Sequence, residues 1–548
     1  MGQYAWLVRS TSIRQLLTAW GLSYAGDLAA FTAASVYAYH AGGAGLVAVL
    51  GLLKALPGVL LVPLVTSGSD RLRRERLLVA TAVPRALLLA AAAAAMGGGG
   101  EGVLVVVFVG LEGGLASAFR QLQAALLPWL AHTPEELTGA NTVTSVLQSA
   151  AMVAGPAVAA CLLAVGTAQQ AMLVACGFVA VAAVLLAWVR PLSAASAESP
   201  ASSAPSARSA GWARQFWLDL AAGFDAGIRR RDALTLFAPA AAQSFGRGVL
   251  NVLTVAIALN LFALGSAGVG WLSAVLGAGG LLIGPLAITL VRGKRVARSF
   301  ACGVAAWGVP LLLLGFARAP YWPYLMFGLI GVAGVFSDAG EYSALQQVIP
   351  SRQMGRALGV RRGALLLAMA LGSAVTPLLI DAVGICGTLV ATGLLLVALA
   401  AASLPRLTVI DRQIAAPGPD LDLLRRVSFF RPLPFAIVEH LAGVLRAEEF
   451  PAGDAIIGEG EPGERFYIIA AGRVLATKEG RPLREMGAGD SFGEIALLRR
   501  IPRTATVTAL GPVETRVLDR EEFLAAVTGN AESVQGAEEV VSVRLQAD

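Results

Sequence analysis

Hydrophobic residues occur along most of the chain in long runs, without the regularly spaced polar positions of a helix on the surface of a soluble protein. A helix needs about 20 apolar residues to cross the hydrocarbon core of a bilayer, where backbone groups must be paired within the helix. The pattern therefore predicts twelve transmembrane helices in two sets of six. Their expected positions are 14–39, 44–66, 77–97, 102–130, 139–165, 168–189, 233–262, 267–291, 297–316, 322–347, 358–383 and 386–404.

The polar segments between these runs alternate in charge. One set is basic and comprises 69–76, 190–231, 292–298 and 350–356. The other set is short, and Arg318 is its only Lys or Arg. Basic loops stay on the cytoplasmic side of a membrane. We therefore expect a multi-pass protein of the inner membrane of a bacterium, with both termini in the cytoplasm.

The composition agrees with a bilayer environment and argues against several functions. Hydrophobic residues make up 56% of the chain and charged residues only 14%, against roughly a quarter in soluble proteins. The net charge of +6 fits basic inner loops better than a nucleic-acid binder. Three His and four Cys without CxxC spacing predict no metal site. No nucleophile–base pair or ATP-binding P-loop is found, so we expect neither an enzyme nor a cofactor.

The two halves of the apolar region resemble each other at an offset close to 217 residues. "TPEELTGAN" precedes a span in the first half and "PSRQMGRALG" precedes the corresponding span in the second. Repeated six-helix halves are a known transporter architecture. The segment 191–211 is rich in Ala, Ser and Pro and predicts a linker, followed by an amphipathic helix. The expected domains are 1–190, the linker 191–231, 232–405, a second linker 406–419 and 420–548.

After Pro405 the pattern changes to that of a small soluble domain. Residues 420–450 predict short amphipathic helices, and short β-like runs between recurring glycines follow. A further helix is expected near 534–547. The predicted fold class is thus an all-α membrane bundle of twelve helices plus a small cytoplasmic α+β domain with a β jelly-roll barrel.

Three local patterns in the apolar region resemble the major facilitator superfamily, especially its drug and siderophore exporter branch. "FRQLQAALLPWL" is similar to the fourth-helix pattern and "VAGPAVA" to the fifth-helix antiporter signature. "SDRLRRER" is similar to the loop between helices two and three, although Thr66 and Arg73 stand where that family prefers Gly. The residues that carry the resemblance are Arg120, Gln123, Gly155, Pro156, Asp70, Arg71 and Arg74.

Charged residues inside the predicted spans are the candidates for transport. An intramembrane Arg must face a wet cavity or a carboxylate, and Asp27 is the expected partner of Arg120. Burial raises the pKa of a carboxyl group and a nearby Arg lowers it, so a carboxylate subject to both effects can take up and release a proton. The alternative for each of these charged residues is a structural ion pair or a helix-end side chain that reaches the membrane interface, and we interpret Lys54 and Arg85 as structural or near the interface. Further candidates are Glu112, Arg247, Asp338 and Glu341.

The stretch "FGEIALLRRIPRTATV", residues 492–507, suits a phosphorylated ligand. A glycine before a short helix leaves backbone N–H groups free for an anion, and Arg503 is a forked donor suited to phosphate. Glu494 can accept a hydrogen bond from a sugar hydroxyl. The stretch resembles the phosphate-binding cassette of cyclic-nucleotide-binding domains. That resemblance implies a short helix of Gly493, Glu494, Ile495 and Ala496, Glu494 on the ribose 2′-hydroxyl, Arg503 on the cyclic phosphate, and Thr504 and Ala505 beside the ligand.

Together these patterns predict a secondary transporter, with proton-coupled export of an unknown small molecule, regulated by a cyclic nucleotide. The expected ligand is cAMP in preference to cGMP, and a degenerate domain without a ligand is the alternative. Two further functions stay open for the bundle, a transport-inactive, membrane-anchored sensor and a facilitator of lipid or solute. The expected partners are the lipid bilayer, the proton, the nucleotide and the transported molecule, but no nucleic acid. A homodimer is a further expectation, because cytoplasmic binding domains often pair.

Overall fold

The structure is a computed structural model that describes residues 11–68, 74–99, 101–130, 134–188, 231–290, 296–348, 351–415 and 419–547. It divides into two compact units, Met1–Arg412 and Gln413–Asp548. The predicted linker and amphipathic helix of 191–230 lie outside the described residues, as do Asp70 and Arg71.

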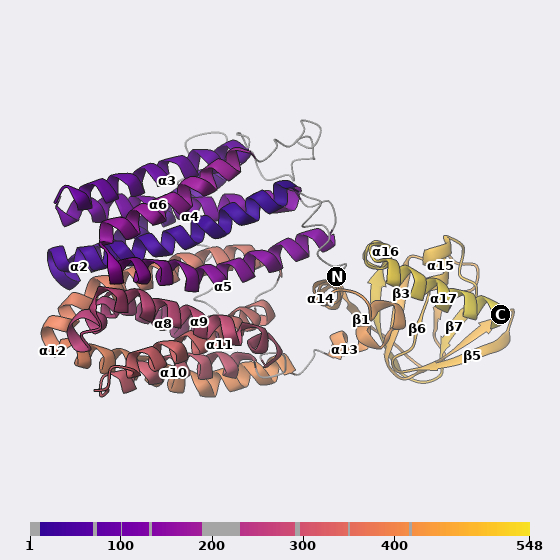
Figure 1. Ribbon diagram of the computed structural model, residues 1–548. Coiled ribbons are helices and arrows are strands. Elements are labelled where there is room, and N and C mark those ends of the chain that lie inside the picture. Colours follow the sequence, from indigo (N-terminus) through magenta and orange to yellow (C-terminus); the bar gives the residue numbers. More distant parts are fainter. Residues whose placement is uncertain are drawn as a thin grey trace, which may run out of the picture. The chain divides into compact units, whose positions relative to one another are not determined.

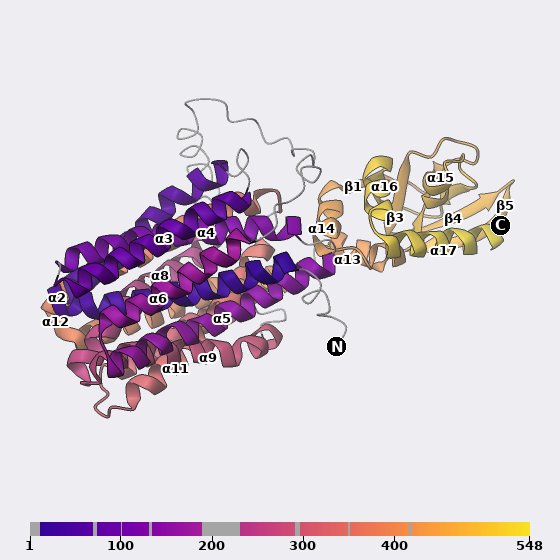
Figure 2. The same ribbon diagram turned by 45° about the horizontal axis from the view of Figure 1, so that its top comes forward.

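The first unit consists of long helices, which Figures 1 and 2 show running side by side. The helices of its first half are α2 (Thr11–Gly68), α3 (Arg74–Gly97), α4 (Gly102–Leu130), α5 (Pro134–Val165) and α6 (Ala168–Ala187). Those of its second half are α8 (Arg231–Ala256), the π-helical turn η2 (Ile257–Leu261), α9 (Gly265–Leu290), α10 (Val296–Leu314), α11 (Trp322–Val348) and α12 (Ser351–Ala415).

Ten of the described helices are long and apolar enough to cross a membrane, judged by length and composition. The two longest contain non-helical backbone, at Gly42 and Gly43 in α2 and at Gly384 in α12. Gly43 and Gly384 have φ of 64° and 73°, values that glycine adopts without strain. Each break lies between two of the hydrophobic runs predicted from the sequence.

Glycines allow close contact between helices in both halves. A Cβ atom at Gly155 of α5 would lie 2.5 Å from the carbonyl oxygen of Ala25 in α2, so only glycine permits this approach. In the second half, Gly372 of α12 lies in the same way against the backbone of Phe245 in α8. Residues 155 and 372 are 217 positions apart, which is the offset of the repeat found in the sequence.

Helix α12 continues beyond the last apolar run, which was predicted to end at residue 404. It extends to Ala415, so most of the segment 406–419 that was predicted as a linker is helical. Asp411 holds this extension against α10. Its carboxylate accepts hydrogen bonds from the backbone N–H groups of Ala297 (2.8 Å) and Arg298 (3.1 Å), at the N-terminus of α10 where an anion is favoured.

The second unit contains two four-stranded antiparallel sheets. One sheet has the order β1 (Arg446–Phe450), β8 (Val513–Asp519), β3 (Arg465–Ala471) and β6 (Ser491–Phe492). The other has the order β2 (Ala455–Ile457), β7 (Thr506–Ala509), β4 (Arg473–Lys478) and β5 (Arg481–Gly487). This is the strand order of a jelly roll, as the spacing of glycines had predicted.

Helices flank the sheets of the second unit. They are α13 (Pro419–Arg426), the 3₁₀ turn η3 (Ser428–Phe430), α14 (Phe435–Val444), α15 (Glu494–Arg499), α16 (Arg520–Thr528) and α17 (Ala531–Ala547). Four buried aromatic rings, of Phe429, Phe430, Phe466 and Phe523, join η3 and α16 to β3, with the rings of Phe466 and Phe523 4.6 Å apart. This core fixes the position of β3, which lies beside β6 and the helix α15 that follows it.

Candidate functional site

A cavity in the second unit is lined by every residue that the cassette pattern had singled out. Its volume is about 170 Å³. These residues come from the β6–α15 connection and from the segment that enters β7, two stretches that the fold brings to one place. The lining includes Gly493, Glu494, Ile495, Ala496, Arg503, Thr504 and Ala505.

Gly493 makes the turn from β6 into α15 with a left-handed backbone conformation, φ 94°. A Cβ atom at this position would lie 2.7 Å from Nη1 of Arg503 and 3.0 Å from the carbonyl oxygen of Arg465. Glycine is therefore required both by the backbone and by the space that Arg503 occupies.

Replacing Gly493 with alanine is expected to lower the free energy of unfolding by about 1–2 kcal/mol and to weaken binding at the cavity, because Arg503 must move. Gly480→Ala is the matched control, since Gly480 also has positive φ (78°) but has no atom within 4 Å of its would-be Cβ. Chemical denaturation gives the stability of each variant and titration its affinity. Equal losses of affinity in both variants would contradict this account.

Arg503 is a buried cation whose side chain has only neutral carbonyl groups as hydrogen-bond partners among the described residues. Its residue is 5% exposed, and its guanidinium donates hydrogen bonds to the carbonyl oxygens of Gly493 (2.9 Å) and Arg465 (2.7 Å). Its backbone N–H donates to the carbonyl of Glu461 at 2.8 Å. Burial lowers the pKa of the Arg503 guanidinium, yet arginine stays charged at neutral pH. No carboxylate of the described residues forms an ion pair with it, so the cavity suits an anion.

Glu494 lies at the start of α15 and is 1% exposed. Its Oε1 accepts a 2.6 Å hydrogen bond from Nη1 of Arg544, a residue of α17 that also lines the cavity. Its Oε2 is buried without a hydrogen-bond partner among the described residues. A buried acceptor without a partner costs free energy, and a ligand hydroxyl would satisfy it.

The rest of the cavity wall is largely apolar and comes from the second sheet and its surroundings. Ile457, Ala476, Met486 and Val507 lie along it, and Val543 of α17 is a further apolar residue of the lining. The cavity therefore offers a cation for a phosphate, a free carboxylate oxygen for a hydroxyl and an apolar surface for a ring. The sequence had not singled out Arg544 or Val543. Both residues lie in the C-terminal helix that was expected near 534–547 and that the cassette resemblance places over the ligand.

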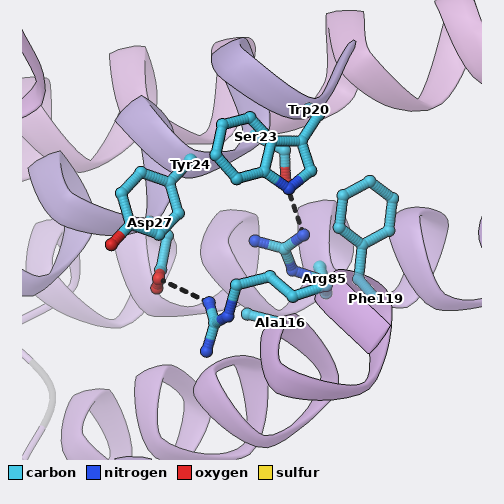
Figure 3. Close-up of a pocket in the computed structure, with 8 residues that line it drawn as sticks. Trp20, Ser23, Tyr24, Asp27, Arg85, Ala116 and Phe119 are labelled. Carbon is cyan, nitrogen blue, oxygen red and sulfur yellow. Dashed lines mark hydrogen bonds and ion pairs between the residues drawn. The ribbon is translucent and has the colours of Figure 1, made fainter. Parts of the chain in front are cut away.

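A second candidate site lies in the first unit, where Figure 3 shows a pocket lined by Trp20, Tyr24, Asp27 and Arg85 among others. Asp27 of α2 forms two ion pairs. Its Oδ2 lies 3.4 Å from Nη1 of Arg120 in α4, the partner expected from the sequence, and its Oδ1 lies 2.7 Å from Nζ of Lys54. The sequence had not identified Lys54 as part of this site.

Arg85 of α3 forms a second, deeper ion pair beside the same pocket. Its Nη2 lies 2.7 Å from Oε1 of Glu112 in α4. Its Nη1 donates to Oγ of Ser23 at 2.6 Å, and Figure 3 shows Arg85 and Ser23 among the pocket residues. The Arg85 side chain is 1% exposed and that of Glu112 is not exposed. Arg85 is thus an internal ion-pair residue, which agrees with its structural interpretation.

The ion pairs of Asp27, Lys54, Arg120, Arg85 and Glu112 form the charged cluster of the first unit. The other residues predicted for transport do not belong to this cluster. Arg247 pairs with Asp338 at 2.6 Å, with side chains that are 40% and 55% exposed, and Glu341 pairs with Arg361 at 2.6 Å. Gln123 is buried, and its amide nitrogen has no partner among the described residues. Pro156 follows Gly155 within α5, where its carbonyl oxygen would lie 2.6 Å from a Cβ at Gly270 of α9. Arg74 is the first residue of α3.

Comparison with known proteins shows which family of domains the second unit resembles. Residues 447–530 match the family model of the cyclic nucleotide-binding domain. The cAMP-dependent protein kinase regulatory subunit of Dictyostelium discoideum is 39% identical over 110 residues, which are 19% of this chain and 34% of that protein. The cGMP-dependent protein kinase egl-4 of Caenorhabditis briggsae is 34% identical over 113 residues, 21% of this chain and 15% of that protein. The co-crystal structure of the regulatory domain of Toxoplasma gondii PKA with cAMP is 28% identical, covering 22% of this chain and 49% of that chain, with a TM-score of 0.21.

The match covers both stretches of the cassette, whereas Val543 and Arg544 of the cavity lining lie beyond its last residue. The chain spans about a third or less of the length of these curated relatives. The C-terminal unit therefore contains a cyclic nucleotide-binding domain, as the sequence predicted. The charged cluster of the first unit lies outside the region that matches.

Proposed function

We propose that the chain is a secondary transporter of the cytoplasmic membrane whose activity is set by cAMP bound to its C-terminal domain. The nucleotide half of this proposal rests on one observation, a cavity lined both by Arg503, a buried cation without an ion pair among the described residues, and by Glu494, whose Oε2 has no hydrogen-bond partner there. Arg503 would bind the cyclic phosphate, and Glu494 Oε2 would accept the ribose hydroxyl. The slightly higher identity to the cAMP-dependent relative, 39% against 34%, supports cAMP over cGMP.

Thermal unfolding of the purified full chain tests ligand binding. A ligand that binds only the folded state raises stability in proportion to the logarithm of its concentration, about 2.7 kcal/mol at a hundred times the dissociation constant. We expect cAMP to raise the unfolding temperature of the C-terminal unit and cGMP to do so at higher concentration. A larger effect of cGMP would reverse the assignment of the base, and no effect of either would contradict nucleotide binding.

Arg544 is expected to tie α17 to the bound ligand through Glu494. Arg544→Ala removes this bond and should weaken cAMP binding about fivefold, because a hydrogen bond between charged groups at a partly exposed site contributes about 1 kcal/mol. Arg499→Ala, at an exposed position in the last turn of α15, is the matched control and should leave the affinity unchanged. Equal affinity of the Arg544 variant and the wild type would show that α17 does not contribute to binding.

The transport half of the proposal rests on the first unit. Ten described helices are long and apolar enough to cross a membrane, and division of the two longest at Gly43 and Gly384 gives twelve segments, the number that a transporter of two six-helix halves would have. Large apolar side chains such as Leu87 and Leu282 are exposed, which favours a lipid environment over water. The ion-paired Asp27 and Arg120 inside this bundle support proton-coupled movement of a small molecule.

A nucleotide can change transport only if the domain binds it with different affinity in different states of the transporter. The test is flux of candidate solutes in sealed proteoliposomes, with and without a proton gradient and with cAMP on the domain's side. We expect gradient-driven flux that cAMP changes in the wild type but not in Arg503→Ala protein. Nucleotide binding without any flux would favour a membrane-anchored sensor, and flux without a gradient would favour a facilitator.

A further inference from the structure

We infer that the charged cluster of the first unit binds an organic anion, an inference that rests on the proposed transport function and names its class of substrate. Away from their ends, helices α2 to α6 carry five charged side chains. Three are cations, Lys54, Arg85 and Arg120, and two are carboxylates, Asp27 and Glu112. All five lie in the ion pairs described above, so the cluster holds one positive charge more than its own carboxylates balance.

The surplus charge is on the accessible part of the cluster. The Glu112 and Arg85 side chains are 0% and 1% exposed, and they neutralise each other. Asp27 is 5% exposed, whereas its two cationic partners Lys54 and Arg120 are 22% and 31% exposed. A solute that reaches the cluster therefore meets two cations that share one carboxylate.

Both accessible cations have hydrogen-bond donors left over. Among the described residues, the Lys54 ammonium donates only to Asp27, at Oδ1 (2.7 Å) and at the carbonyl oxygen (3.4 Å). The Arg120 guanidinium contacts Asp27 at 3.4 Å, which is long for a charged pair, and donates to Ser117 Oγ at 2.9 Å. A guanidinium has five N–H donors and an ammonium three, so a carboxylate, sulfonate or phosphate group can bind both cations beside Asp27.

One aromatic ring lies near each of these cations and suits an apolar body attached to the anionic group. The Lys54 ammonium lies 4.7 Å from the centroid of Phe31, and the Arg120 guanidinium 6.0 Å from that of Tyr24. Tyr24 is stacked on Trp20, with centroids 5.4 Å apart. The ligand chemistry is therefore an anionic group on an apolar or aromatic body, from a soluble metabolite or from a lipid headgroup.

Charge-changing variants distinguish an anion site from a cation site. The probes are tritiated naphthalene-2-sulfonate and, as the opposite charge, benzyltriethylammonium, with binding measured on the full chain in phosphatidylcholine nanodiscs. Lys54→Gln and Arg120→Gln should each weaken sulfonate binding about tenfold, because each removes charge-assisted hydrogen bonds. Asp27→Asn should tighten it about tenfold, because the internal competitor for the two cations is gone. Arg14→Gln, which removes one positive charge at the exposed start of α2, should have no effect.

Each outcome decides the inference. Tightening in Asp27→Asn together with weakening in Lys54→Gln supports it, and unfolding curves of each variant show whether the fold is retained. If Asp27→Asn does not fold, the two cation variants alone decide. Binding of neither probe, loss of benzyltriethylammonium binding in Asp27→Asn, or equal sulfonate binding in all variants would overturn it. Competition by phosphatidylglycerol would identify a lipid headgroup as the source of the anion, and its absence a soluble anion.

Flux of the same probes in proteoliposomes separates this inference from the transport proposal. Sulfonate that binds at the cluster but is not moved would leave the inference standing and contradict transport. Gradient-driven movement of benzyltriethylammonium, but not of the sulfonate, would leave transport standing and overturn the inference.

Discussion

Replacing Arg503 with alanine is expected to lower the affinity for cAMP by about a hundredfold or more. Two charge-assisted hydrogen bonds from one guanidinium contribute about 3 kcal/mol or more to binding, and each 1.4 kcal/mol is a factor of ten. The ligand phosphate would also lose a cation that is held deep in the cavity wall, since Arg503 is 5% exposed. Titration of cAMP into the wild type and the variant measures the loss.

Two controls separate loss of the site from loss of the fold. Arg473→Ala removes an arginine of β4 that is 73% exposed and pairs with Glu485 on the surface, so it should leave both affinity and unfolding unchanged. Arg503→Lys keeps the charge but cannot form the forked contact, so it should lose less affinity than the alanine variant. A wild-type affinity in Arg503→Ala protein would remove this residue from the site.

Replacing Arg85 with methionine is expected to lower the free energy of unfolding of the first unit by about 3–5 kcal/mol. The variant leaves Glu112 buried without a cation, and an uncompensated buried charge is strongly destabilising. Thermal unfolding in detergent, followed by intrinsic fluorescence, measures the change. Arg247→Met is the matched control, because the Arg247–Asp338 pair is exposed and should contribute less than about 1 kcal/mol.

The double variant Arg85→Met with Glu112→Leu completes the test. It removes both charges, so it should recover much of the stability that the single variant loses. A double variant that is as unstable as the sum of the two single variants would show that the two side chains do not act as a pair.

Most of the features that could be predicted from the sequence alone are determined by residues that lie close together along the chain. Hydrophobic runs located the helices of the first unit, because a run of about 20 apolar residues without a polar interruption is long enough to form one helix of the length that spans a bilayer. The cassette residues could be grouped in advance because Gly493 and Arg503 belong to one short β6–α15–β7 connection. The ion pair of Asp27 with Arg120 was also foreseen although the two residues are 93 positions apart, because the hypothesis of an arginine within a membrane span called for a carboxylate partner.

Features that depend on tertiary packing could not be predicted in this way. Arg544 reaches Glu494 from a helix 50 residues further along the chain, and no local pattern indicates that contact. Lys54 joins the Asp27 site only because α2 turns back at Gly42 and Gly43. The extension of α12 to Ala415 was missed because hydropathy marks where apolar burial ends, whereas helical hydrogen bonding continues beyond it.

The central claim is that this chain senses a cyclic nucleotide through its C-terminal unit. Isothermal titration of cAMP, and separately of cGMP, into the purified full chain tests it most directly. The account predicts one saturable site per chain with a dissociation constant in the micromolar range or below, a preference for cAMP, and no measurable heat with Arg503→Ala protein. Absence of binding heat for both nucleotides with the wild-type chain would contradict it.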